Sequence, residues 1–115
     1  MTDEKEAQQL MGQAQAYQQQ MQGMLLQKEQ LKVQLMEINK AMEELDKSNE
    51  KDFYRISGPL LIKTSKADAK KDLKEKQDLI NKRLGTIESG EKRIKEKIEG
   101  LRQKLAGVSQ EKGAG

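Results

Sequence analysis

The apolar residues of this chain recur at two different spacings. From residue 10 to residue 45, and again from residue 73 to residue 108, an apolar residue returns after alternate steps of four and three residues. This spacing is typical of coiled-coil helices, whose buried seam repeats every 3.5 residues or so. The pattern predicts helices at about residues 5–48 and 66–108, followed by a flexible tail at residues 109–115.

The seam positions of the two predicted helices are almost all apolar. The first series is Leu10, Ala14, Tyr17, Met21, Met24, Lys28, Leu31, Leu35, Ile38, Met42 and Leu45. The second series is Leu73, Gln77, Ile80, Leu84, Ile87, Glu91, Ile94, Ile98, Leu101, Leu105 and Val108. Because the two series are equally long, we expect the helices to pair antiparallel within one mainly α-helical domain, residues 1–115.

Each series contains one charged residue, Lys28 in the first and Glu91 in the second. Folding the chain back about its centre brings these two residues close together. We expect the pair to set the register of the helices more than to stabilise them, since the loss of hydration offsets the Coulomb attraction. A chance coincidence of two charges is the alternative.

Between the helices, residues 53–64 alternate with the two-residue period of β-strands around a turn at residues 57–59. This pattern predicts a β-hairpin. The expected cross-strand pairs are Ile56 with Leu60 and Tyr54 with Ile62. One face of the hairpin then holds Tyr54, Ile56, Leu60 and Ile62, and the other holds Phe53, Arg55, Leu61 and Lys63. Ser65 is expected to cap the second helix, with Asp68 at its third position.

An isolated two-stranded hairpin is marginally stable in water and leaves both strand edges unpaired. Both predicted helices already use their seams, so the apolar face of the hairpin needs other chains to cover it. We expect oligomer assembly through this face, with several hairpins joining into an intersubunit sheet or barrel. The expected assembly residues are Tyr54, Ile56, Leu60 and Ile62.

Composition narrows the possible functions. The chain has no Cys and no His, which excludes disulfides, zinc fingers and imidazole catalysis, and no cofactor, metal site or enzymatic activity is expected. The first ten residues are too acidic and polar for a signal peptide, and no apolar run reaches the ~20 residues that span a membrane. We expect a cytoplasmic protein without membrane contact. The net charge of +3 is a weak argument for nucleic-acid binding.

Apolar residues outside the seam have two possible roles. In the first helix these residues are Met11, Leu25, Leu26, Val33 and Met36. They can form an adaptable surface for many partners, to which Met is well suited, or they can pack against a neighbouring subunit. At the ends of the helices far from the hairpin, partial unwinding would also expose apolar seam residues.

The order of heptad helix, single hairpin and heptad helix resembles a β-type prefoldin subunit. The stretch "GPLLIKTSKADAKKDLKEKQDLI" carries most of the resemblance, together with "YQQQMQ" and "QLKVQLMEINKAMEELDK" in the first helix. The similarity covers residues 8–108 or so. It implies a hexamer of two α-type and four β-type subunits, in which the hairpins build a double β-barrel and the coiled coils extend from it.

The resemblance also implies a function. Prefoldins are chaperones that capture unfolded polypeptides at the coiled-coil tips without ATP and deliver them to a group II chaperonin in the cytosol. Carried onto this chain, client contact involves Leu10, Met11, Tyr17, Met21, Leu101, Leu105 and Val108. The alternatives are a passive coiled-coil scaffold or tether that binds no client, and a nucleic-acid binder.

Overall fold

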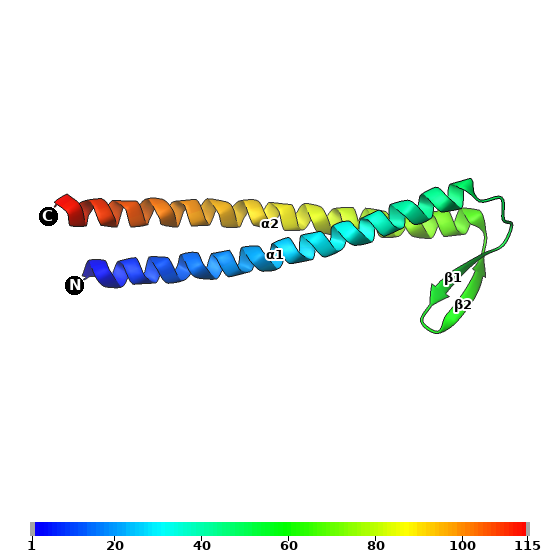
Figure 1. The fold of residues 1–115 in the computed structure, drawn as a ribbon, viewed down its shortest axis with the longest axis horizontal. Helices are drawn as coiled ribbons and strands as arrows, with labels where there is room; N and C mark the ends of the chain where they lie inside the picture. The colour runs from blue at the N-terminus through cyan, green and yellow to red at the C-terminus, as the bar shows by residue number, and fades with distance from the viewer. Residues whose placement is uncertain (1, 115) are drawn as a thin grey trace. The chain divides into compact units, whose positions relative to one another are not determined.

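The computed structural model describes the backbone of residues 2–114 and the side chains of residues 4–107. Helix α1 (Thr2–Lys47) is followed by strands β1 (Phe53–Ser57) and β2 (Leu60–Thr64) and by helix α2 (Lys66–Ala114) (Figure 1). The fold is mainly α-helical, with one β-hairpin between two long helices. The predicted class of fold is confirmed.

The limits of the elements differ from the prediction only near the termini. The hairpin lies within the expected limits of residues 53–64. Helix α2 extends past its predicted end at about residue 108, and its helical backbone continues to Ala114. Gln110, Glu111 and Lys112 all favour helix, and each added residue extends the hydrogen-bond ladder of an existing helix at little cost. The helix therefore extends beyond its predicted end at about residue 108, and flexibility of residues 109–115 stays a prediction.

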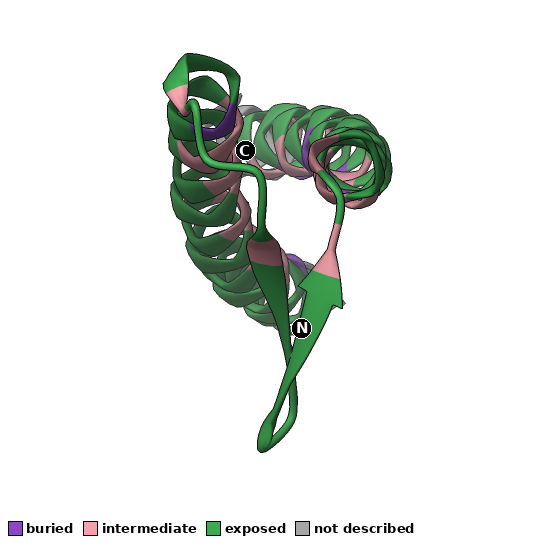
Figure 2. Cartoon of the chain, turned by 90° about the vertical axis from the view of Figure 1, so that its right-hand side faces the viewer, coloured by how far each residue is buried: buried purple, intermediate pink, exposed green. Residues whose placement is uncertain are grey.

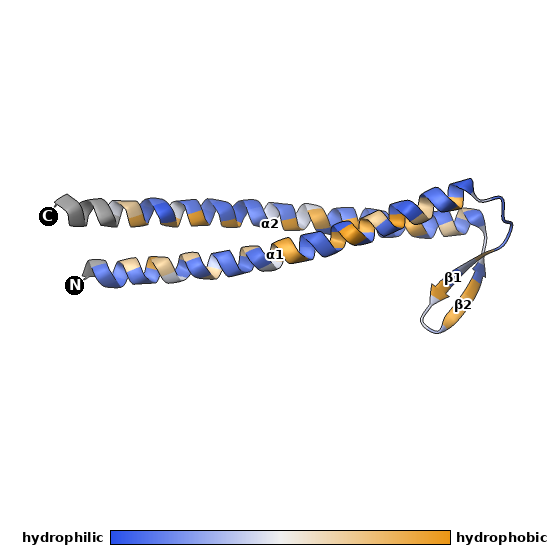
Figure 3. Ribbon diagram, in the orientation of Figure 1, coloured by the Kyte–Doolittle hydropathy of each residue, from blue (hydrophilic) through white to orange (hydrophobic). Residues whose placement is uncertain are grey.

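The chain forms two compact units, to which both helices contribute. The terminal unit comprises residues 1–28 and 86–115, and the hairpin unit comprises residues 29–85. Within each unit, α1 and α2 run antiparallel, and their apolar residues lie on the sides that face each other (Figure 3).

The terminal unit has a narrow apolar seam. Leu10, Ile94 and Leu101 are buried in it, and each of the predicted seam positions whose side chain is described there is buried or half-buried. The side chain of Val108 lies outside the described residues. A two-helix seam leaves the outer side of each helix in water, and this explains why so charged a chain can still fold.

The hairpin unit continues the same pattern in its two helical segments. Leu45, Ile80 and Leu84 are buried, and the other predicted seam positions are half-buried. Helix α2 begins where expected, because the Ser65 hydroxyl oxygen accepts a hydrogen bond from the backbone N–H of Asp68 at 3.1 Å. Ser65 is therefore the N-cap of α2, as predicted.

The hairpin has a different register from the predicted one. Its pairs are Phe53 with Thr64, Tyr54 with Lys63, Arg55 with Ile62, Ile56 with Leu61, and Ser57 with Leu60. Directly paired residues place their side chains on the same face of a sheet. The predicted face of four apolar residues is therefore wrong. One face holds Tyr54, Ile56, Leu61 and Lys63, and the other holds Phe53, Arg55, Leu60 and Ile62.

The turn explains this difference. The loop contains two residues, Gly58 and Pro59, rather than three, since Ser57 is the last paired residue of β1. Gly58 has a φ of 58°, and the ring of Pro59 fixes its own φ near −65° or so. Glycine with positive φ at the first central position is the pattern of a type II′ hairpin turn. Shortening the loop by one residue moves every side chain of β2 to the opposite face.

Candidate functional site

The first candidate site is the outer face of the hairpin. Tyr54, Ile56 and Leu61 are exposed by 63%, 75% and 69%. The hairpin is exposed along nearly its whole length (Figure 2). Its two strands form the complete sheet, so each strand has one unpaired edge. An apolar face next to unpaired edges is the kind of surface on which other chains add strands.

The other face of the hairpin turns toward helix α2. The Arg55 guanidinium forms an ion pair with the Asp72 carboxylate at 3.1 Å. On the same face, Ile62, which is paired with Arg55, is 39% exposed, and Phe53 is half-buried. A hollow of about 340 Å³ lies beside β1, with Leu45 and Leu73 among its lining residues. The Arg55–Asp72 pair was not predicted from the sequence, because it depends on the orientation of the hairpin.

Lysine side chains connect the helices at the base of the hairpin. Lys66 Nζ donates hydrogen bonds to the backbone carbonyls of Asp46 at 3.3 Å and Ser48 at 3.2 Å. Lys70 forms an ion pair with the Asp46 carboxylate at 3.1 Å. The last carbonyls of a helix lack partners within the helix and attract cations. Lys66 therefore satisfies the end of α1 and fixes the start of α2 beside it.

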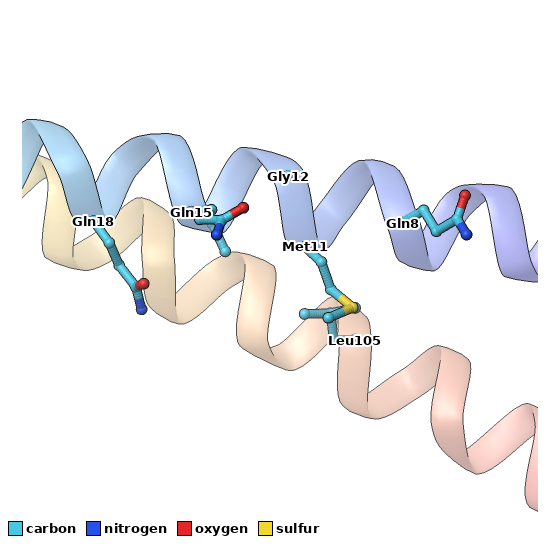
Figure 4. A pocket seen from close by; sticks show the side chains of 7 residues that line it. Gln8, Met11, Gly12, Gln15, Gln18 and Leu105 are labelled. Carbon is cyan, nitrogen blue, oxygen red and sulfur yellow. The ribbon is translucent and has the colours of Figure 1, made fainter.

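The second candidate site is a groove in the terminal unit, with a volume of about 490 Å³ (Figure 4). The described residues that line it are Gln8, Met11, Gly12, Ala14, Gln15, Gln18 and Leu105. The Met11 side chain projects from α1 toward Leu105 on α2 (Figure 4). Met11 is 62% exposed, so its thioether is available to a bound molecule.

The residues predicted to contact clients have different degrees of burial. Leu10 and Leu101 are buried in the seam and become accessible only if the helices separate. The half-buried ones are Tyr17, Met21 and Leu105, and Met11 is exposed. The ammonium nitrogen of Lys97 also lies over the Tyr17 ring, 5.6 Å from the ring centroid. Client contact by these residues stays a prediction. The sequence alone did not identify Gln8, Gln15 and Gln18 as groove residues, since Gln is common on any solvated helix.

The predicted proximity of Lys28 and Glu91 is confirmed. Lys28 Nζ donates a hydrogen bond to Glu91 Oε2 at 3.5 Å within the seam of the terminal unit.

The large apolar residues of α1 outside the seam are all exposed, by 46% to 70%. They are Met11, Leu25, Leu26, Val33 and Met36. Their exposure fits both alternatives considered above.

Within the described part of the chain, no three acidic residues gather closely enough to hold a metal ion. Neither helix, over its described residues, has a stretch that is both long and apolar enough to cross a membrane.

These features define a class of protein, a two-helix coiled-coil subunit with an exposed β-hairpin between its helices. A family model described as prefoldin subunit matches residues 8–112. The chain therefore belongs to the prefoldin family, as its sequence pattern predicted. Prefoldin subunits are non-enzymatic chaperone components, and β subunits assemble with other prefoldin subunits into a complex.

Similar proteins support this assignment. The chain is 40% identical over 101 residues to the prefoldin subunit beta of Thermococcus onnurineus, covering 87% of each sequence. It is 38% identical to the prefoldin subunit beta of Pyrococcus furiosus, over 87% of this chain and 86% of that protein. It is also similar to the crystal structure of the prefoldin beta subunit from Thermococcus strain KS-1. That similarity has a TM-score of 0.83 at 33% identity and covers 89% of this chain and 90% of the other.

Proposed function

We propose that this chain is the β-type subunit of a holdase, a chaperone that holds unfolded polypeptides without ATP and delivers them to a group II chaperonin in the cytosol. The observation that carries the proposal is the apolar outer face of the hairpin, with Ile56 exposed by 75%. A chain of the prefoldin family with such a face needs partner subunits. Client binding then falls to the terminal unit, which contains none of the residues used in assembly.

Assembly proceeds through the hairpins in this proposal. The complex contains two α-type and four β-type subunits, whose hairpins pair edge to edge into an intersubunit barrel. Closing a sheet removes its unpaired edges and buries its apolar face. The assembly residues of this proposal are those predicted from the sequence, with Tyr54 and Ile56 on the outer face and Leu60 and Ile62 on the other. Leu61 is added because it pairs directly with Ile56 on the outer face.

Capture uses several weak contacts at once. Each terminal unit offers a small apolar surface, including Met11 and Leu105. Separate arms that hold one client raise its effective concentration at the remaining arms, so that avidity replaces strong single contacts. Clients are selected by the apolar surface that they expose, and no covalent step or nucleotide is needed.

Aggregation of a denatured model protein tests this function. The chain is first assembled with an α-type subunit, and the mass of the complex is measured. We expect the complex to suppress aggregation without ATP. A complex whose chain lacks residues 1–20 and 100–115 is expected to assemble through its hairpins but to protect poorly. Equal protection by both complexes would contradict client binding at the terminal unit.

The passive scaffold is the other function that this experiment addresses. A complex that assembles fully and gives no protection favours a scaffold or tether. Transfer of a bound client to a purified group II chaperonin, followed by the appearance of folded client, tests delivery separately.

A further inference from the structure

The two helices of the terminal unit differ sharply in charge. From residue 7 to residue 27, helix α1 has no Asp, Glu, Lys or Arg, although 36% of the whole chain is charged. The α2 segment of residues 86–107 in the same unit carries Glu88, Glu91, Lys92, Arg93, Lys95, Glu96, Lys97, Glu99, Arg102 and Lys104. Residues 7–27 of α1 therefore present an uncharged surface beside a highly charged segment of α2.

The groove described above lies along this uncharged surface. Gln8, Met11, Gln15 and Gln18 follow one another at steps of three and four residues, which places them on one face of α1. We call these four residues the glutamine face. No charged residue is among the described residues that line the groove. A Cβ built at Gly12 would meet nothing within 4 Å, so the groove is open at this position.

The chemistry of the glutamine face matches that of a polypeptide backbone. A glutamine amide has two N–H donors and a carbonyl acceptor, and a peptide group offers one N–H donor and one carbonyl acceptor to pair with them. It can therefore pair with the main chain of any sequence, while Met11 and Leu105 adapt to whichever apolar side chains lie beside them. From Gln8 to Gln18 the helix rises by about 15 Å, the length of about four or five residues of extended chain.

We propose that the glutamine face binds an extended segment of unfolded polypeptide through its main chain, and that it does so without discriminating between acidic and basic clients. This inference rests on the proposed function and specifies what the terminal unit recognises. A folded partner keeps its peptide groups paired within its own helices and sheets, so it cannot offer them to these amides. The uncharged lining likewise gives no preference for a charged ligand.

Added charge gives the first test. One complex carries Gln8→Glu, Gln15→Glu and Gln18→Glu, and a control carries Gln9→Glu, Gln13→Glu and Gln20→Glu, on exposed glutamines of the same segment outside the described groove lining. The probes are two fluorescent unfolded peptides of equal apolar content, one acidic and one basic. The unaltered complex should bind both within about twofold at low salt, and the first variant should lose affinity for the acidic peptide by about fivefold or more.

The control variant should keep the two affinities within about a factor of two of each other. A first variant that behaves like the control overturns the location of the site. An unaltered complex that already prefers one charge by about tenfold or more overturns charge-independent recognition. Circular dichroism of both variants checks that the helices are intact.

Backbone methylation gives the second test and uses the unaltered complex. Alternate N-methylation of a neutral unfolded peptide removes main-chain donors and keeps its side chains. Affinity should fall by about threefold to tenfold, and the fall should shrink when Gln8, Gln15 and Gln18 are all replaced by Ala. An equal fall in both proteins overturns recognition by these amides. If the affinity falls equally in both proteins but the unaltered complex still suppresses aggregation, the proposed function stands and only this inference fails. If the unaltered complex does not suppress aggregation, both the proposed function and this inference are contradicted.

Discussion

Lys28 Nζ lies 3.5 Å from Glu91 Oε2 in the seam of the terminal unit, with side-chain exposures of 21% and 7%. The second carboxylate oxygen of Glu91 has no hydrogen-bond partner among the described residues. A buried carboxylate with one long contact is poorly compensated for the water that it loses. We therefore propose that the pair contributes more to the register of the two helices than to their stability, because any shift separates Lys28 from Glu91.

Charge reversal at Glu91 tests the pair. Glu91→Lys places two ammonium groups in the seam, so it should lower the melting temperature more than Glu88→Lys, which alters an exposed site of the same helix. Thermal unfolding followed by circular dichroism measures the difference. Similar melting temperatures for the two variants would remove the energetic argument for the pair.

Replacing both partners has the opposite effect. Lys28→Leu combined with Glu91→Leu should stabilise the helices by about 1–4 kcal/mol, since apolar residues fill the seam without loss of hydration. The same variant should populate shifted registers, which disulfide trapping between cysteines introduced on both helices would detect. A single trapped register would mean that the surrounding apolar residues define the register by themselves.

The outer face of the hairpin should control assembly. Ile56→Asp combined with Leu61→Asp puts two carboxylates at a directly paired position, and burial of that face in an oligomer then becomes costly. We expect the complex to dissociate, leaving a chain of 13.1 kDa that a mass measurement identifies. Ser57→Asp, on an exposed polar residue of β1, is the control and should leave the complex intact. Assembly of the double variant would exclude this face.

Most of the fold could be predicted because the spacing of apolar residues along the chain identifies the seam of a coiled coil. Every described seam residue, from Leu10 to Leu105, is buried or half-buried where the heptad pattern placed it. The cap at Ser65 could be predicted too, since capping depends on a few neighbouring residues. Local chemistry of this kind requires no knowledge of distant contacts.

The hairpin register could not be obtained from alternation alone. A three-residue and a two-residue loop give equally regular strands, and they differ only in which residues face each other. The positive φ of Gly58 selects the two-residue loop, and Gly-Pro as its two central residues was the available clue.

The groove was missed for another reason. Its glutamines are ordinary on a solvated helix, and their importance depends on Leu105 of the other helix lying beside them.

The Arg55–Asp72 ion pair should position the hairpin for assembly. The two side chains are 49% and 33% exposed, so breaking the pair should weaken assembly by about 1 kcal/mol at most, or about fivefold in the dissociation constant. Arg55→Asp alone and Asp72→Arg alone should both show this loss. The combined variant should recover most of it, as measured by titration with an α-type subunit. Without recovery, the pair has no positioning role.

Loss of the cap at Ser65 should affect stability at the start of α2. The Ser65 hydroxyl accepts the Asp68 N–H at 3.1 Å, so Ser65→Ala leaves that donor unpaired and should destabilise the chain by about 1 kcal/mol. Ser89→Ala is the matched control, because Ser89 is exposed within α2, where alanine has the higher helix propensity. The control should therefore unfold in urea at the same concentration as the unaltered chain or at a slightly higher one. If Ser65→Ala and the control unfold at the same urea concentration, water replaces the Ser65 cap without loss of stability.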